Sequence, residues 1–182
     1  MKFPNLIYKI NWRIILLHIV ATIFIILCAQ QFAKLNDIEI IKLVDKYGAE
    51  NALKQLQKDT NYPSRISDFL LWNSISNLIG LLTAFILSFT IIIKKKMFWL
   101  NSLIIFILGL LFIRLGLFKN QIINTLFYSF GDLFPNFGLL YKYIINGTIL
   151  LIFALLIFFN RWINNFALNY LSNKKDTETK LI

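Results

Sequence analysis

The sequence has very few of the residues from which most active sites are built. Its 182 residues include one cysteine, Cys28, and one histidine, His18, and both lie in apolar runs. A single cysteine excludes a disulfide or a dithiol redox pair within one chain, and a single histidine excludes a multi-histidine metal site within it. We therefore expect no metal and no cofactor.

Charge is also scarce. Only 15% of the residues are charged and 58% are hydrophobic, whereas soluble domains have about 25% and roughly 45–50%. The 19 basic and 9 acidic residues give a net charge of +10, which in a soluble protein indicates a nucleic-acid partner. Because long apolar runs separate these charges, we predict an integral membrane protein that binds no nucleic acid.

Four apolar segments are long enough to cross a hydrocarbon layer of about 30 Å as helices, which takes about 20 residues. They are residues 14–33, 69–93, 97–117 and 139–160. Lipid cannot satisfy backbone polar groups, and the segments lack the alternation of barrel strands, so helices are expected. The first segment is too long for the apolar part of a signal peptide. The predicted fold is all-α, one membrane domain with a bundle of four transmembrane helices.

Basic residues predict the orientation, because they collect in short flanks on the cytoplasmic side. With the N-terminus in the cytoplasm, that side carries ten basic and two acidic residues, a net +8, and the other side nine and seven, a net +2. Lys94, Lys95 and Lys96 form the turn between the second and third spans. Their contacts with anionic lipid head groups help to hold this turn inside. We predict that both termini are cytoplasmic.

Residues 34–68 form the largest extracytoplasmic segment, and their pattern predicts amphipathic helices. Asn36 and Glu39 fit a capping box, and Gly48 is placed to end a first helix in a left-handed conformation. Two stripes follow helical spacing: Ile40, Leu43, Val44 and Tyr47, then Ala49, Ala52, Leu53 and Leu56. The segment either lies on the membrane surface, capping the bundle, or is a docking surface for another protein.

Two further segments lie outside the predicted spans. Residues 118–138 contain a short apolar stripe and then a break at Gly131, Pro135 and Gly138, which predicts an interfacial helix or a re-entrant segment. Residues 172–182 are polar and are expected to form a mobile cytoplasmic tail.

No Asp or Glu lies in the middle of a predicted span, and the chain has no phosphate-binding loop, HExxH or GxSxG motif. These absences count against an ion-coupled carrier, a membrane aspartyl protease and the common hydrolases. We expect no catalytic residue and no enzymatic activity. For His18, a proton relay is the alternative to a neutral, interhelically bonded histidine. Arg114 is expected to reach the outer interface and to pair with Asp132 or Asp68.

Small and polar residues recur on the predicted spans, where they allow close packing of helices or hydrogen bonds between them. The candidates for helix contacts or for a pore lining are Asn73, Asn77, Gly80, Ala84, His18, Thr22, Gly109 and Gly147. Packing within one bundle, association of copies of the chain and a pore lined by the second span all remain open.

The frequent use of Lys, Asn, Ile and Phe indicates an AT-rich, bacterial genome, and hence the bacterial cytoplasmic (inner) membrane. In size and layout the chain resembles small four-span bacterial membrane proteins, including immunity proteins that neutralise pore-forming toxins. We predict a non-enzymatic protein that acts by contact, as an accessory or regulatory subunit or as an immunity or defence component. Its partners are membrane lipids and another membrane protein or a second copy. The alternative is an oligomeric channel for ions or small solutes.

Overall fold

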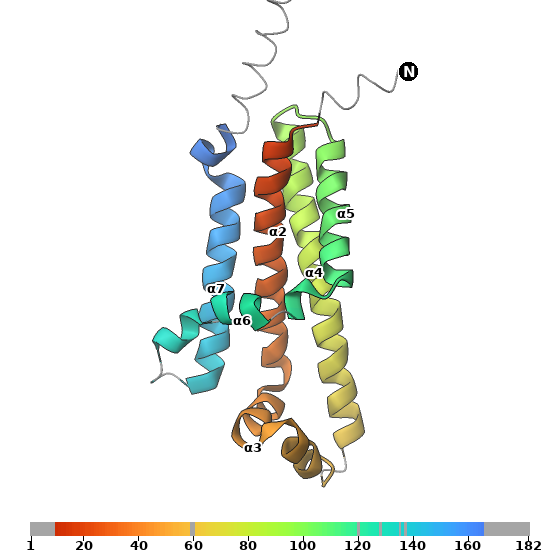
Figure 1. Ribbon diagram of the computed structural model, residues 1–182, viewed down its shortest axis with the longest axis vertical. Helices are drawn as coiled ribbons and strands as arrows, with labels where there is room; N and C mark the ends of the chain where they lie inside the picture. The colour runs from red at the N-terminus through yellow and green to blue at the C-terminus, as the bar shows by residue number, and fades with distance from the viewer. Residues whose placement is uncertain are drawn as a thin grey trace, which may run out of the picture.

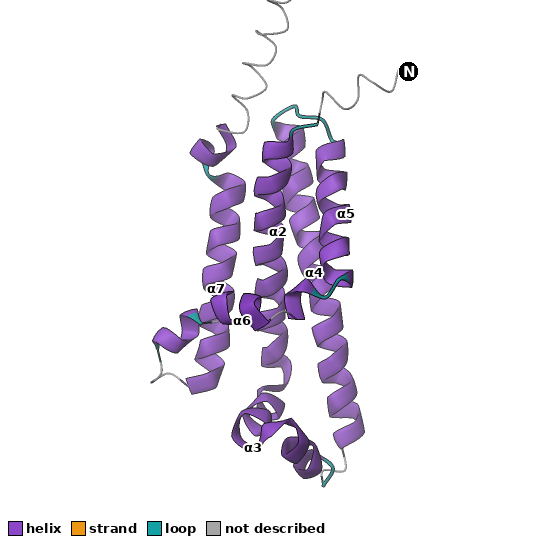
Figure 2. Cartoon of the chain, in the orientation of Figure 1, coloured by secondary structure: helices purple, strands orange, loops and turns teal. Residues whose placement is uncertain are grey.

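The computed structural model describes residues 10–58, 61–119, 121–127, 129–134, 136 and 138–165. Every regular element in these ranges is helical and none is a strand (Figure 2), which confirms the all-α prediction. The predicted tail, residues 172–182, lies outside the described residues.

The long helices form a bundle around α2 (Trp12–Ala33), which packs against α4 (Tyr62–Lys94), α5 (Leu100–Arg114) and α7 (Gly138–Phe159). Figure 1 shows α2 in the middle, with α7 on one side and α4 and α5 on the other. Among the described residues, three clusters of buried apolar side chains follow α2 along its length. The first joins α2 to α4 and α5, the second to α4 and α7, and the third to α4, α7 and Phe118. Because α4 and α7 make few direct contacts, α2 holds the two sides of the bundle together.

The start of α2 is fixed by two asparagines. The side-chain oxygen of Asn11 accepts the backbone N–H groups of Arg13 and Ile14 at 3.1 and 3.3 Å, which satisfies donors that the first turn of a helix leaves unpaired. The backbone N–H of Asn11 in turn donates to the side-chain oxygen of Asn101 at 3.1 Å. The beginnings of α2 and α5 therefore lie side by side at one end of the bundle.

In the described part of the chain, three helices are long and apolar enough to cross a membrane: Trp12–Gly48, of which α2 is the apolar part, Pro63–Lys94 and Gly138–Phe159. They indicate a multi-pass membrane protein. The third predicted span differs in length, because residues 97–117 contain a helix of only 15 residues, α5. At 1.5 Å per residue α5 is about 22 Å long, less than the ~30 Å of a hydrocarbon core. The three long helices are thus observed, and crossing by α5 stays a prediction.

The turn between α4 and α5 contains the three lysines. Lys94 is the last residue of α4, and Lys96 has a positive φ of 54°. The N–H of Lys96 bonds to the carbonyl of Ile93, and the N–H of Met97 to that of Ile92, both at 2.9 Å. This pair of bonds is a Schellman motif, in which the last carbonyls of a helix are satisfied by a left-handed residue. The lysines thus form a tight turn, as predicted.

The segment after α2 consists of a 3-10 turn, η1 (Lys34–Asp37), and α3 (Ile38–Leu56). The predicted capping box is wrong by one residue, because the side chain of Asp37, not Asn36, accepts the N–H of Ile40 at 3.2 Å. Gly48 interrupts α3 with a positive φ of 74°, but its ψ of 162° is extended rather than left-handed helical. Figure 1 shows α3 beyond the end of α2, away from the α4–α5 turn.

Residues 117–134 form short helical turns along the flank of the bundle: η2 (Leu117–Lys119), α6 (Gln121–Phe127) and η3 (Phe130–Leu133). Figure 1 shows α6 crossing α2 part-way along its length, between the end of α5 and α7. Phe118, Ile123 and Phe127 pack with Leu27 and Cys28 of α2. The segment is thus attached to the bundle by its apolar side chains.

Candidate functional site

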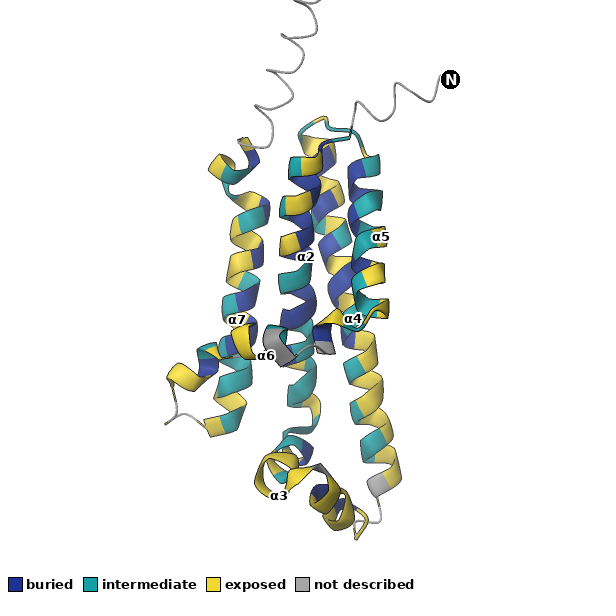
Figure 3. Ribbon diagram, in the orientation of Figure 1, coloured by how far each residue is buried: buried dark blue, intermediate teal, exposed yellow. Residues whose placement is uncertain are grey.

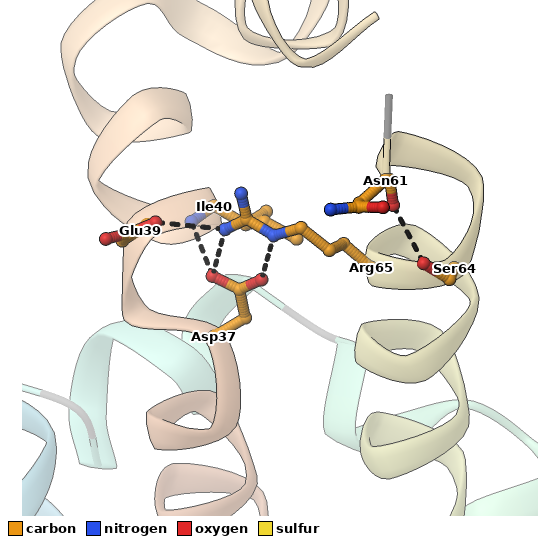
Figure 4. Close-up of polar contacts among 6 residues, drawn as sticks. All are labelled: Asp37, Glu39, Ile40, Asn61, Ser64 and Arg65. Carbon is orange, nitrogen blue, oxygen red and sulfur yellow. Dashed lines mark hydrogen bonds and ion pairs between the residues drawn. The ribbon is translucent and has the colours of Figure 1, made fainter. Parts of the chain in front are cut away.

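A cluster of three charged side chains joins η1 and α3 to the first turn of α4 (Figure 4). The guanidinium of Arg65 donates from Nε and Nη2 to the two carboxylate oxygens of Asp37 at 3.0 and 2.9 Å. Nη2 also lies 3.1 Å from a carboxylate oxygen of Glu39. Two parallel bonds between Arg and a carboxylate fix orientation as well as distance. The cluster therefore sets the direction in which α3 leaves the bundle.

The two apolar stripes of α3 are each partly buried and partly exposed. Ile40, Ala52 and Leu56 are buried. Val44 and Tyr47, by contrast, retain 41% and 37% of their accessible surface. Leu53 likewise stays exposed. Figure 3 shows that α3 is largely exposed, whereas buried residues gather where the long helices meet. The α3 segment therefore presents apolar side chains at the surface of the molecule.

A groove of about 640 Å³ lies beside α2 on the same half of the bundle. Its lining comes from α2, η1 and α4, with one residue of α7, Leu151. Along α4 it extends from Trp72 to Thr83, which is about 16 Å of helix. Its floor is formed by buried residues, among them Cys28, Ser76 and Gly80, and its walls by the exposed side chains of Trp72, Ile79 and Phe32.

The groove offers few polar groups to an occupant. The hydroxyl of Ser76 donates to the carbonyl of Asn73 at 2.8 Å, so it is already satisfied within α4. Asn36 stands at the end of the groove nearest the Arg65 cluster, next to Asp37. The other polar lining residue is Thr83. The groove therefore suits an apolar ligand far better than a polar one.

Several small residues predicted at helix contacts do face another helix. A Cβ on Gly80 would lie 2.8 Å from the Cα of Ile26, so α2 and α4 approach backbone to backbone. Ala84 is fully buried in the cluster that joins α2, α4 and α7. A Cβ on Gly147 of α7 would meet the ring of Phe32 at 3.0 Å. These residues pack the helices of one chain together.

The predicted polar residues of α2 are buried in the same way. His18 is buried with its Nδ1 2.8 Å from the hydroxyl of Ser88 in α4, and its ring lies edge-on to Phe158 of α7. The hydroxyl of Thr22 donates to the carbonyl of His18 at 2.7 Å. The methyl group of Thr22 faces Gly109, where an added Cβ would lie 3.5 Å away. His18 thus connects three helices by one hydrogen bond and one ring contact.

The two asparagines predicted to line a pore are engaged inside the chain. The side-chain oxygen of Asn77 accepts a bond of 2.6 Å from the amide of Gln30 in α2. The amide of Asn73 donates to the carbonyl of Phe69 in its own helix at 3.1 Å. Asn77 therefore contributes a contact between α2 and α4.

The predicted pairing of Arg114 with Asp132 or Asp68 is corrected by the structure. The carboxylate of Asp132 lies 2.5 Å from the ammonium of Lys142. The backbone N–H of Gly131 also donates to Asn146 of α7 at 2.7 Å. These contacts hold η3 against α7, whereas Arg114 is the last residue of α5. Asp132 is therefore held beside α7, and within the described part of the chain no ion pair joins Arg114 to Asp132 or to Asp68.

Sequence reasoning missed both the Arg65 cluster and the groove. Asp37 and Arg65 each lie just outside an apolar segment, which is the available signal that their helix ends could meet. Among the described residues no group of three His, Cys, Asp or Glu side chains could hold a metal ion. The buried polar side chains there are amides, hydroxyls and one imidazole, with no carboxylate.

No protein-family model matches the chain. Neither a curated protein nor a solved structure matches it either.

Proposed function

We propose that the chain is a non-enzymatic, multi-pass membrane protein that acts through protein–protein contacts. It would serve as an accessory or regulatory subunit of a membrane complex, or as an immunity or defence component. The observation that carries the proposal is the outer segment α3, which exposes Val44, Tyr47 and Leu53 while Arg65 fixes its direction through Asp37.

Two physical points support a docking role. Fixing α3 in advance lowers the entropy that is lost when a partner binds. Exposed apolar patches that are rimmed by polar residues mark interaction sites. Around Val44 and Tyr47 the helix carries exposed Lys42, Asp45 and Lys46. A partner that binds at Val44 and Tyr47 would bury these apolar side chains and could pair its own charges with the charged residues around them.

We place the protein in a bacterial cytoplasmic membrane with four spans and both termini in the cytoplasm. The start of α2, the lysine turn and the end of α7 lie at one end of the bundle (Figure 1). That end carries Arg13, Lys94 and Arg161, in agreement with the rule that basic flanks remain inside. With this orientation α3 is extracytoplasmic.

Photo-crosslinking in intact cells tests the proposal. A photoreactive phenylalanine analogue is placed at position 47, at position 50 on the same segment as a matched control, and at position 86 on the exposed face of α4. We expect one discrete protein adduct from position 47, a weaker one from position 50, and lipid adducts from position 86. If position 47 gives lipid adducts and no protein adduct, α3 rests on the membrane surface, which is the alternative interpretation of this segment.

The oligomeric channel lined by α4 stays an alternative prediction. Because the Asn77 side chain bonds to Gln30, we favour the contact function. Ion flux through reconstituted vesicles that falls on replacing Asn77 by Leu would reverse this preference.

A further inference from the structure

We propose that the groove between α2 and α4 binds one acyl chain of a phospholipid whose zwitterionic head group lies at the Arg65 cluster. The inference goes beyond the contact function, since it concerns another surface and another class of ligand. It stands on the dimensions of the groove, on its lining and on the charges at its end.

The dimensions favour a chain over a helix. The groove has a volume of about 640 Å³, within the roughly 300–1,000 Å³ that is usual for sites of small ligands. An α-helix with its side chains is about 10–12 Å across. A helix of a partner would therefore lie across the opening. A hydrocarbon chain is far thinner and enters lengthwise.

The lining matches a hydrocarbon chain. The floor residues Ile25 and Cys28 are almost fully buried, while Phe32 and Trp72 form walls that are open to the outside. The hydroxyl of Ser76 is satisfied by the carbonyl of Asn73, so an apolar occupant leaves no donor unpaired there. Burial of apolar surface between protein walls then stabilises the bound chain through dispersion contacts.

The charges at the end of the groove match a zwitterion. Leu35 and Asn36 line this end, and Asp37 follows them directly. The residues just beyond this end, Lys34, Asp37, Glu39 and Arg65, carry two positive and two negative charges, and both carboxylates bond to Arg65. Lys34 lies 5.1 Å from the centre of the Tyr143 ring. Anionic lipids are selected by clusters of basic residues, so a cluster of balanced charge favours a head group that carries both signs.

Fluorescence of Trp72 reports on the groove, because this residue forms one wall. The other three tryptophans, Trp12, Trp99 and Trp162, lie toward the opposite end of the long helices. Replacing those three by Phe leaves Trp72 as the only indole. The full-length protein is reconstituted in vesicles of phosphatidylethanolamine and phosphatidylglycerol, of which one lipid carries bromine atoms on its chains as the quencher.

A matched control is available on the same helix. Leu82 has the same exposed fraction as Trp72, 44%, but does not line the groove. A Leu82→Trp variant that also carries Trp72→Phe therefore reports on ordinary contact with lipid. We expect brominated phosphatidylethanolamine to quench Trp72 at least twofold more than this control, and brominated phosphatidylglycerol to quench the two positions alike.

Filling the groove completes the test. Thr83→Phe and Ala29→Leu each add apolar volume to the lining, and Ile86→Phe adds it to an exposed face outside the groove. We expect the first two to reduce the excess quenching of Trp72 to the level of the control, with Ile86→Phe unchanged and helicity equal in all variants. Quenching of Trp72 that equals the control in the parent protein would overturn the proposal. The proposal would also be overturned if the excess quenching of Trp72 persisted in Thr83→Phe and Ala29→Leu. The same holds if brominated phosphatidylethanolamine and brominated phosphatidylglycerol gave equal excess quenching. Quenching that falls as the ratio of protein to lipid rises would assign the groove to a second copy instead.

Discussion

Arg65 and Asp37, which are 28 positions apart, are joined by two hydrogen bonds of 3.0 and 2.9 Å between guanidinium and carboxylate (Figure 4). The same carboxylate accepts the N–H of Ile40 at 3.2 Å and so caps α3. One side chain therefore both starts α3 and attaches it to α4. The two roles have different chemical requirements, which makes them separable by substitution.

Substitutions at Asp37 should separate the cap from the ion pair. Asp37→Asn keeps an oxygen for Ile40 and loses the charge, so we expect a cost of about 0.5–1 kcal/mol, typical of a partly exposed pair. Asp37→Ala also removes the cap, which adds about 1–2 kcal/mol. Thermal unfolding of the purified protein in mild detergent measures both. Glu50→Gln on the same segment is the control, and equal losses for Asn and Ala would show that the cap contributes nothing.

Gly80 should tolerate no side chain, because a Cβ there would lie 2.8 Å from the Cα of Ile26. That neighbour is backbone and cannot rotate away, so α2 and α4 must separate. We expect Gly80→Ala to lower the midpoint of thermal unfolding, although Ala favours a helix over Gly by up to about 1 kcal/mol. Leu82→Ala, on the exposed face of α4, should lower it less. A higher midpoint for Gly80→Ala would mean that helix propensity outweighs the close approach.

The bond between Gln30 and Asn77 should contribute to stability rather than to permeation. Its length is 2.6 Å and it joins α2 to α4, and side-chain bonds between helices in membranes contribute about 0.6–1.7 kcal/mol. Asn77→Leu should therefore destabilise the protein by about this amount, and Gln30→Leu should add little to it in the double variant. Vesicles containing either form should show the same low ion flux. Additive losses in unfolding would argue against the bond.

Replacing Lys96 by glycine should stabilise the protein. It occupies the left-handed position of the Schellman motif with a φ of 54°, a conformation that costs L-residues roughly 1–2 kcal/mol and glycine very little. We expect Lys96→Gly to stabilise the protein by about 1 kcal/mol. Lys95→Gly removes the same charge from a residue with a φ of −88°, so it should give no such gain. A gain from both variants would point to relief of charge repulsion instead.

Hydropathy predicted the helices but not how they are arranged. All four apolar segments are helical, and Gly80 and Ala84 lie against other helices. The sequence did not show that α5 is short, because Met97 and Leu117 are as apolar as the helix between them. The turns that bound α5 are set by backbone conformation, which hydropathy does not register.

The sequence also did not predict which charged side chains pair across helices. Arg114 and Asp132 are near in sequence, and a shared outer side suggested that they pair. The structure instead places Asp132 beside Lys142, because Gly131 packs closely on the backbone of Lys142 and bonds to Asn146. Likewise, the pairing of Asp37 with Arg65 depends on where α3 turns, which no local pattern in the sequence specifies. Tertiary contacts decided both cases.

Labelling of single cysteines should show whether α5 crosses the membrane. In a Cys28→Ala background, Lys96→Cys lies in the lysine turn, Tyr47→Cys on α3 and Leu133→Cys in η3, all at exposed positions. We expect a membrane-impermeant maleimide added to intact cells to label positions 47 and 133, and position 96 only after lysis. Because α5 is about 22 Å long, crossing requires the bilayer to thin locally, and such mismatch costs only fractions of a kcal/mol per Å. Labelling of positions 133 and 96 from the same side would mean that α5 turns back inside the membrane, leaving three crossings. Labelling of position 96 in intact cells would reverse the orientation of the whole bundle.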